Sequence, residues 1–461
     1  MHYVTISELS VQLRNKTLSP VELVDHMLNR IAALEPQLSA FVTVTAERAR
    51  QQAISAEQEI VGGNWRGALH GVPVAFKDII YSSFAPTTAG TLIHKDFRPE
   101  FSATVLRRME MAGAITLGKL KTTEQAWADH HPSVTPPKNP WNAAVWPGAS
   151  SSGSGVATAA GLAYGTLGSD TGGSIRFPSA ANGLTGLKPT WGRVSRYGVF
   201  ELAASLDHIG PLARSATDCA ILLGAIAGAD AADPTAVAEP LENYETSALD
   251  GVAGLRIGLP RSYATDGIDP EVVKVWEQAA AVLSSLGAIV REVDFPAWRE
   301  VAESWETICS PETARAHAAT YPSKSEQYGE MLAALIESGR NHTAVELAAA
   351  HQLRLDFSGR LRALFLDCDL LLIPVIAWPT PSLDSWRALA SGSLADVLRF
   401  TAPFNISGSP TLTLPAGFDN RGLPIAVQLV GRHFCEGTIL RAGSAFQRAT
   451  DWHGRHPGLF P

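Results

Sequence analysis

Two glycine-rich loops carry serine residues that could act as nucleophiles. The first is Gly148-Ala149-Ser150-Ser151-Ser152-Gly153, and the second is Ser-Asp-Thr-Gly-Gly-Ser-Ile-Arg-Phe-Pro at residues 169–178. Ser150 and Ser174 lie 24 residues apart, and a run of small residues typical of a helix separates the loops. A serine hydroxyl is a weak nucleophile until a base accepts its proton. The loops therefore predict serine chemistry with a base from elsewhere in the chain.

The histidines supply no obvious base. The chain has 13 of them, and none lies in either loop. The G-x-S-x-G elbow of α/β-hydrolases is also absent, because Ala149 and Arg176 replace the glycines that would flank Ser151 and Ser174. A Ser-His-Asp triad assembled in space stays an alternative without support from the sequence.

Lys77 is the other candidate base. It follows the apolar run at residues 72–76. A free lysine has a pKa near 10.4, so only about 0.04% of it is neutral at pH 7. Moving that pKa to about 7 costs roughly 4.6 kcal/mol, and burial among apolar neighbours can supply a shift of this size. The alternative is a lysine at a strand end, or one paired with Asp78.

The turn before Ser174 predicts an oxyanion site. Gly172 and Gly173 allow consecutive backbone N–H groups to point the same way. Donors arranged in this manner stabilise the negative oxygen of a tetrahedral intermediate, often by about 10²–10³ in rate for each donor. We expect the N–H groups of Thr171, Gly172, Gly173 and Ser174 to form this site.

The order of small residues, acid, serine, Ile-Arg and Pro from Gly148 to Ser179 resembles the amidase signature family of C–N hydrolases. Phe-Asn-Ile-Ser-Gly-Ser-Pro at 404–410 and Gly-Leu-Pro-Ile-Ala-Val-Gln at 422–428 resemble that family's C-terminal segments. The resemblance thus covers most of the chain. It implies an α/β fold in one large domain, with a central, mixed, twisted β-sheet covered on both faces by α-helices.

The resemblance also implies a catalytic triad of Lys77, Ser150 and Ser174. Ser174 would attack the substrate carbonyl, Ser150 would take its proton and Lys77 would take the proton of Ser150. Water would then hydrolyse the acyl-enzyme. Members of the family have a cis peptide bond before the middle serine, which here is the Ala149–Ser150 bond.

Other polar residues of the loops have competing or supporting roles. Ser151 and Ser152 compete with Ser150 as the middle serine, although the spacing from Ser174 favours Ser150. We expect Ser151, Asp170 and Arg176 to support the loops, with Arg176 acting through buried hydrogen bonds.

The substrate pocket is less constrained by the sequence. Several apolar and aromatic residues near the motifs could line a pocket or simply pack in the core, and they would favour an apolar or aryl group. These residues are Ile79, Tyr81, Trp127, Trp146, Phe177, Phe200 and Leu202.

The main hypothesis is an amidohydrolase that cleaves a linear carboxylic amide other than a peptide bond. Carbamate (urethane), urea-type and aryl-anilide hydrolases share the same triad and remain alternatives. The family's glutamine-hydrolysing A subunits of tRNA-dependent amidotransferases usually carry Asn and Gln where this chain has Ile79 and Phe177, which disfavours that activity. A non-catalytic binding protein is the rival from another class, and the retention of all three triad residues disfavours it.

Composition limits the partners and the cellular compartment that we expect for the protein. In 461 residues, 46% hydrophobic and 18% charged side chains predict a soluble protein with a large core. The net charge of −8 argues against nucleic-acid or anionic-membrane partners. Four scattered cysteines without a CxxC pair, together with an N-terminus that lacks a signal sequence, favour the cytoplasm. We expect no metal and no cofactor, a small-molecule amide or carbamate as substrate, and we leave a homodimer open.

The chain divides into four expected segments of one domain. Residues 1–60 are predicted to be helical, and residues 71–215 are predicted to hold the catalytic core. Residues 230–360 are expected to form a variable, partly helical region on the substrate side. Residues 365–461 are expected to add the strands and helix that complete the sheet.

Overall fold

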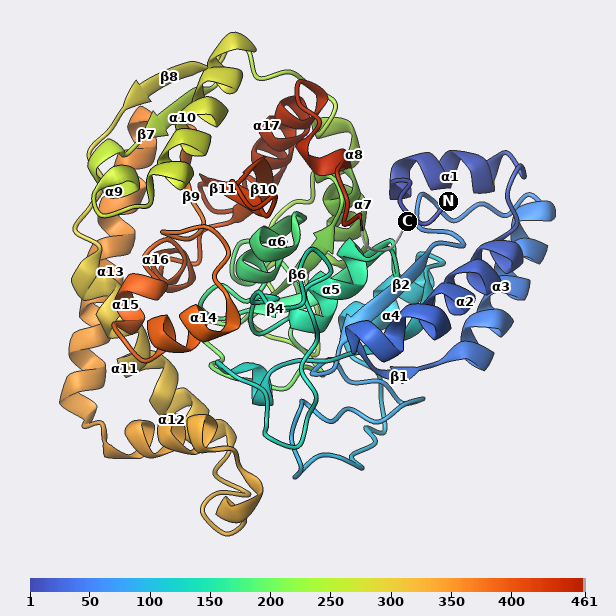
Figure 1. Cartoon of the computed structure of the whole chain (residues 1–461), viewed down its shortest axis with the longest axis horizontal. Helices are drawn as coiled ribbons and strands as arrows, with labels where there is room; N and C mark the ends of the chain where they lie inside the picture. Colours follow the sequence, from blue (N-terminus) through green and yellow to red (C-terminus); the bar gives the residue numbers. More distant parts are fainter. Residues whose placement is uncertain (459–461) are drawn as a thin grey trace.

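The computed structural model describes residues 1–458, which fold around one mixed β-sheet in a single domain. Figure 1 shows β1 and helices α1–α3 at one end of the molecule and β7 and β8 at the other. In the described part of the chain the sheet has eleven strands, in the order β1-β3-β2-β4-β6-β5-β10-β11-β9-β7-β8. The strands are β1 (Phe41–Val44), β2 (Pro73–Lys77), β3 (Ile115–Leu120), β4 (Gly165–Asp170), β5 (Thr185–Lys188), β6 (His208–Ala213), β7 (Arg256–Leu259), β8 (Ile289–Glu292), β9 (Leu370–Pro374), β10 (Thr411–Phe418) and β11 (Pro424–Gly431).

Helices pack around this sheet and cover it (Figure 1). They are α1 (Ile6–Arg14), α2 (Pro20–Leu38), α3 (Ala46–Val61), α4 (Thr104–Met111), α5 (Ser152–Ala159), α6 (Arg176–Asn182), α7 (Ala216–Ile226), α8 (Tyr244–Ser247), α9 (Arg261–Thr265), α10 (Pro270–Ser285), α11 (Arg299–Ala316), α12 (Glu330–Asn341), α13 (Ala344–Asp367), α14 (Leu383–Ala390), α15 (Leu394–Val397), α16 (Ala402–Ile406) and α17 (Glu436–Arg448).

The centre of the sheet brings the predicted chemical residues together. β2 runs parallel to both β3 and β4, with Phe76 opposite Leu167 in β4. Because parallel strands end at the same edge of a sheet, Lys77 at the end of β2 lies next to the end of β4. Every residue of both strands is buried. The sheet therefore delivers Lys77 and the start of the second serine loop to one interior edge.

One prediction of secondary structure needs correction. The helical reading of residues 1–60 is wrong at Phe41–Val44, which forms β1 and pairs with β3. A short segment with mixed burial carries little periodicity, which explains why β1 was not expected.

Neither a membrane span nor a metal cluster is found in the described part of the chain. None of the helices within residues 1–458 is long and apolar enough to cross a membrane. The same residues contain no group of three or more His, Cys, Asp or Glu side chains placed to hold a metal ion.

Candidate active site

Lys77 lies fully buried between two serine hydroxyls. Its Nζ atom is 2.7 Å from Ser150 Oγ and 2.8 Å from Ser169 Oγ. Burial lowers the pKa of Lys77 to about 7, although the negative charges of Asp207 and Asp170 partly oppose this shift. Close to neutral pH the amine is thus neutral in about half of the molecules. A neutral amine has one lone pair, so it can accept a proton from one serine while it donates to the other.

The first loop brings Ser150 to this lysine through a cis peptide bond between Ala149 and Ser150. Gly148 precedes the bond with a φ of 82°, and a Cβ atom there would lie 2.3 Å from the Cα atom of Pro178 in the second loop. Only glycine fits such a close approach of the two loops. The backbone packing therefore fixes the position of Ser150 relative to the second loop.

The two neighbouring serines of the first loop form hydrogen bonds to partners other than Lys77. Ser151 Oγ donates to the Ser169 carbonyl at 3.2 Å, and Ser152 Oγ lies 3.1 Å from Nε2 of His130. Of the three serines, Ser150 is thus the one whose hydroxyl contacts Lys77. No histidine lines the cavity that holds Ser150 and Ser174 among the residues that the structure describes.

Asp170 and Arg176 hold the second loop from within. The Arg176 guanidinium contacts Asp170 at 2.7 Å, with both side chains fully buried, and donates to the Thr401 carbonyl at 2.9 Å. Asn405 Nδ2 also donates to Asp170 at 2.8 Å. These partners hold the pKa of Asp170 well below its usual range, against the opposing effect of burial. Through these hydrogen bonds the pair joins the loop to α16 and its N-cap residue Thr401.

The hydrogen bonds of this loop change the predicted oxyanion site. The backbone N–H of Gly173 donates to Asp170 Oδ1 at 2.9 Å, so it is not free for a substrate oxygen. Gly173 was predicted as a donor, and it serves instead to let the chain turn at a φ of 137° against the Phe177 ring. Thr171, Gly172 and Ser174 remain as the candidate donors.

Ser150 and Ser174 open into a mainly apolar cavity of about 150 Å³. Four of the predicted pocket residues line it, namely Trp127, Trp146, Phe177 and Leu202. The remaining lining residues are Ala126, Ala128, Ala149, Thr171, Gly172, Trp305, Met331, Trp386, Ala390, Leu394, Val397 and Leu398. Phe177 belongs to α6 directly after the serine loop, so one wall of the cavity is built from the same segment as the nucleophile.

Three predicted pocket residues lie elsewhere. Ile79 is buried, and its carbonyl accepts a hydrogen bond from the Phe200 N–H at 3.0 Å. Tyr81 packs edge-on against Phe200, with ring centroids 5.0 Å apart, and both rings line a separate hollow. The chain turns away from the cavity directly after Lys77, which places Ile79 and Tyr81 outside it, and Phe200 packs beside these two residues.

The sequence reasoning missed the far side of the cavity, which we call the roof. It consists of the lining residues of α11, α12, the α14–α15 segment and its C-terminal flank: Trp305, Met331, Trp386, Ala390, Leu394, Val397 and Leu398. Trp386 stacks on Trp146, with ring centroids 3.8 Å apart. Tryptophans in helical segments were the available signal, but they gave no indication of which face they line.

Two polar residues near the base were also missed. Ser169 is the first residue of the second serine loop, and its hydroxyl contacts Lys77. Asp207 is buried and directly precedes β6. The position of Ser169 inside the second serine loop was the signal that could have identified it. Asp207 lies outside both motifs and had no such signal.

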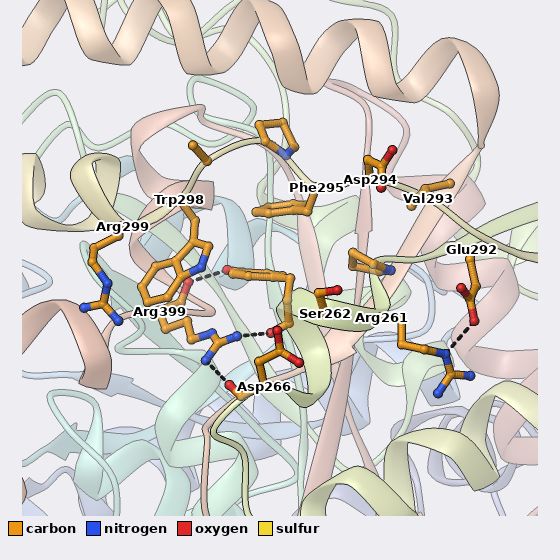
Figure 2. Close-up of a pocket in the computed structure, with 14 residues that line it drawn as sticks. Arg261, Ser262, Asp266, Glu292, Val293, Asp294, Phe295, Trp298, Arg299 and Arg399 are labelled. Carbon is orange, nitrogen blue, oxygen red and sulfur yellow. Dashed lines mark hydrogen bonds and ion pairs between the residues drawn. The ribbon is translucent and has the colours of Figure 1, made fainter.

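A larger hollow of about 590 Å³ lies on another part of the surface (Figure 2). Its arginines have partners: Arg261 contacts Glu292, Arg299 contacts Asp396, and Arg399 donates to the backbone of Asp266 at 2.7 Å. Among residues 1–458, no lysine lines this hollow, and neither Ser150 nor Ser174 does. The smaller cavity is therefore the candidate active site.

The structure thus places a buried lysine against Ser150, and Ser150 in one cavity with Ser174, within an α/β fold. The family model described as Amidase matches residues 22–440. The chain belongs to the amidase signature family and is an enzyme of the class that hydrolyses amide C–N bonds.

Known proteins share this sequence and fold over nearly their whole length. The chain is 44% identical over 455 residues to the Mycobacterium tuberculosis protein named as amidase AmiD, covering 98% of this chain and 95% of the relative. It is 40% identical to a Glutamyl-tRNA(Gln) amidotransferase subunit from Geotalea daltonii, covering 99% of each. The solved structure of 6-aminohexanoate cyclic dimer hydrolase matches with a TM-score of 0.90 at 27% identity, covering 100% of both chains.

Proposed function

We propose that this enzyme hydrolyses an uncharged carboxylic amide with an apolar or aryl group, through Ser174, Ser150 and Lys77. The observation that carries the proposal is one buried site in which Lys77 contacts Ser150, while Ser150 and Ser174 line an apolar cavity. A strongly shifted lysine pKa in such a cavity is typical of a catalytic group.

The reaction follows from these positions. Ser174 Oγ attacks the carbonyl carbon, its proton passes to Ser150 Oγ, and the proton of Ser150 passes to Lys77 Nζ. The new oxyanion accepts hydrogen bonds from the candidate N–H donors at Thr171, Gly172 and Ser174. When the C–N bond breaks, Lys77 returns the proton through Ser150 to the leaving nitrogen. Water then attacks the ester of Ser174 by the same relay and releases the acid.

The lining of the cavity supports an uncharged substrate. None of the described residues that line it is Asp, Glu, Lys, Arg or His, and its polar side chains are those of Ser150, Thr171 and Ser174. A charged group brought there would lose its hydration without gaining a partner. Free glutamine carries both an ammonium and a carboxylate, so this lining supports an amidase over a glutaminase. Aromatic walls such as Trp146 and Trp386 instead suit a flat apolar group.

Substrate profiling tests the proposed bond and group. We expect release of ammonia or aniline from benzamide and an acyl anilide, and none from glutamine. Faster turnover of an aryl carbamate or an aryl urea would reassign the enzyme to the alternatives with the same triad. Glutaminase activity that requires an added partner protein would contradict the proposal.

Covalent labelling tests the triad itself. A fluorophosphonate should modify Ser174, as located by mass spectrometry of the labelled peptide, and Lys77→Ala should abolish this labelling. Equal labelling of the wild type and Lys77→Ala would exclude Lys77 as the base. Ser152→Ala is the matched control, because it removes a buried hydroxyl of the same loop that contacts His130 rather than Lys77.

A further inference from the structure

Asp207 is a buried carboxylate that the proposed relay leaves unused. It accepts hydrogen bonds from the backbone N–H groups of Leu202 at 3.0 Å and Ala203 at 3.2 Å. Its other strong contact is the Thr171 hydroxyl, at 2.5 Å from Oδ1. Burial raises the pKa of Asp207 to about 6, and these donors together with Arg196 oppose that shift. The carboxylate is therefore ionised at neutral pH although it is buried.

The contact with Thr171 orients a peptide of the oxyanion site. Thr171 is held at two points, because its carbonyl also accepts a hydrogen bond from Trp305 Nε1 at 2.8 Å. In a planar trans peptide the N–H of the next residue points opposite to the carbonyl. The Gly172 N–H is therefore aimed away from the Trp305 nitrogen, and Asp207 and Trp305 together fix its direction.

Asp207 also lies beside the base. It lines a small cavity of about 10 Å³ together with Ser169, the second partner of Lys77. Its negative charge favours the ammonium form of Lys77, and it does so more strongly than that of Asp170. Asp170 faces Arg176 in a tight ion pair, so part of its charge is neutralised.

We propose that Asp207 is a positioning residue that couples the base to the oxyanion site, because one carboxylate orients Thr171 and places a negative charge beside Lys77. This inference rests on the proposed triad. The other charged or titratable groups that act on Lys77 or Asp207 are Asp170 from β4, Arg196 from the loop before β6, the buried Cys309 and the half-buried His130. Burial raises the pKa of the Cys309 thiol and lowers that of His130 to about 4, so both are neutral near pH 7.

The test is the pH profile of kcat/KM for Asp207→Asn. Loss of the anion should move the rising limb of the profile to lower pH by about one unit, as expected for removal of a nearby opposite charge. Weaker orientation of Thr171 should lower kcat at the plateau by about tenfold. Asp218→Asn is the matched control, because Asp218 is equally buried with a pKa raised to about 6 but does not act on Lys77. Its profile should keep the wild-type midpoint.

A second variant separates the two effects and covers a failure of Asp207→Asn to fold. Thr171→Val removes the hydroxyl but keeps the carboxylate of Asp207, so kcat should fall while the midpoint of the profile moves less than in Asp207→Asn, because loss of this donor only raises the pKa of Asp207. Full kcat in Thr171→Val, or an unmoved midpoint in a folded Asp207→Asn, would overturn the inference. If one of these two outcomes is found while Lys77→Ala still abolishes the labelling of Ser174, the proposed triad stands and only the role of Asp207 is rejected.

Discussion

The floor and the roof of the active-site cavity are built in opposite ways. We define the floor as Lys77 with the loops at residues 148–153 and 169–178. The floor comes from about a hundred consecutive residues, is fully buried at Lys77 and is held by the Asp170–Arg176 pair. The roof comes from helices more than a hundred residues later, and α14 has no buried residue at all. The comparison indicates that the candidate triad is held by close packing, whereas part of the cavity wall lies on the exposed helix α14.

The largest expected effect is the loss of catalytic activity when a serine of the floor is replaced. Ser174→Ala removes the nucleophile and should lower kcat by about 10⁴ or more, as for removal of a nucleophile that acts as part of a unit. Steady-state hydrolysis of an anilide measures this loss. Ser150→Ala should approach the same loss, whereas Ser152→Ala should retain most of the activity. Comparable rates for Ser150→Ala and Ser152→Ala would remove Ser150 from the relay.

The second effect is on stability and contrasts a buried ion pair with an exposed one. Arg176→Ala leaves Asp170 as an unpaired buried charge and should cost about 3–5 kcal/mol in free energy of unfolding. Arg387→Ala breaks the Arg387–Asp384 pair on α14, where both side chains are largely exposed, and should change stability little. Thermal and urea unfolding compare the two variants. Equal losses would show that the floor is no more tightly held than the roof.

The third effect concerns pH. Because Lys77 must be neutral to accept a proton and its pKa is about 7, kcat/KM should rise with pH up to about 7 and then level off. Below that value activity should fall by about tenfold for each pH unit, as the ammonium form takes over. A rising limb centred above pH 9, as for an exposed lysine, would contradict the role of burial.

The smallest effect is on specificity at the roof. Trp386→Ala removes one aromatic wall and should raise KM for aryl amides by about tenfold, with little change in kcat, because about 1.4 kcal/mol of contact is lost. Trp298→Ala is the control, since it removes an equal ring from the hollow in Figure 2. A similar change for both variants, or an equal change for acetamide, would indicate a general effect on folding.

The sequence predicted the floor better than the roof for a physical reason. Ser150 and Ser174 could be predicted because their turns require glycines nearby, and Lys77 could be predicted because it follows the apolar run at residues 72–76. Trp127, Trp146, Phe177 and Leu202 lie within about thirty residues of these turns in the chain. Gly173 was misassigned because its N–H has a local partner in Asp170, which sequence spacing does not reveal. Trp305 and Trp386 reach the cavity only through tertiary packing of helices, so no local pattern distinguishes them from core residues.

The absence of ionisable groups among the described lining residues of the cavity has a consequence for turnover. Hydrolysis converts a neutral amide into an acid that ionises at neutral pH, and the resulting carboxylate meets the same apolar walls that suited the substrate. Beyond the candidate N–H donors at Thr171, Gly172 and Ser174, the described walls offer this anion no ionisable group to replace the water that it loses, which makes it less stable there. The walls that retain the amide therefore favour departure of its acid, so product inhibition should be weak and the reaction should be driven forward by release.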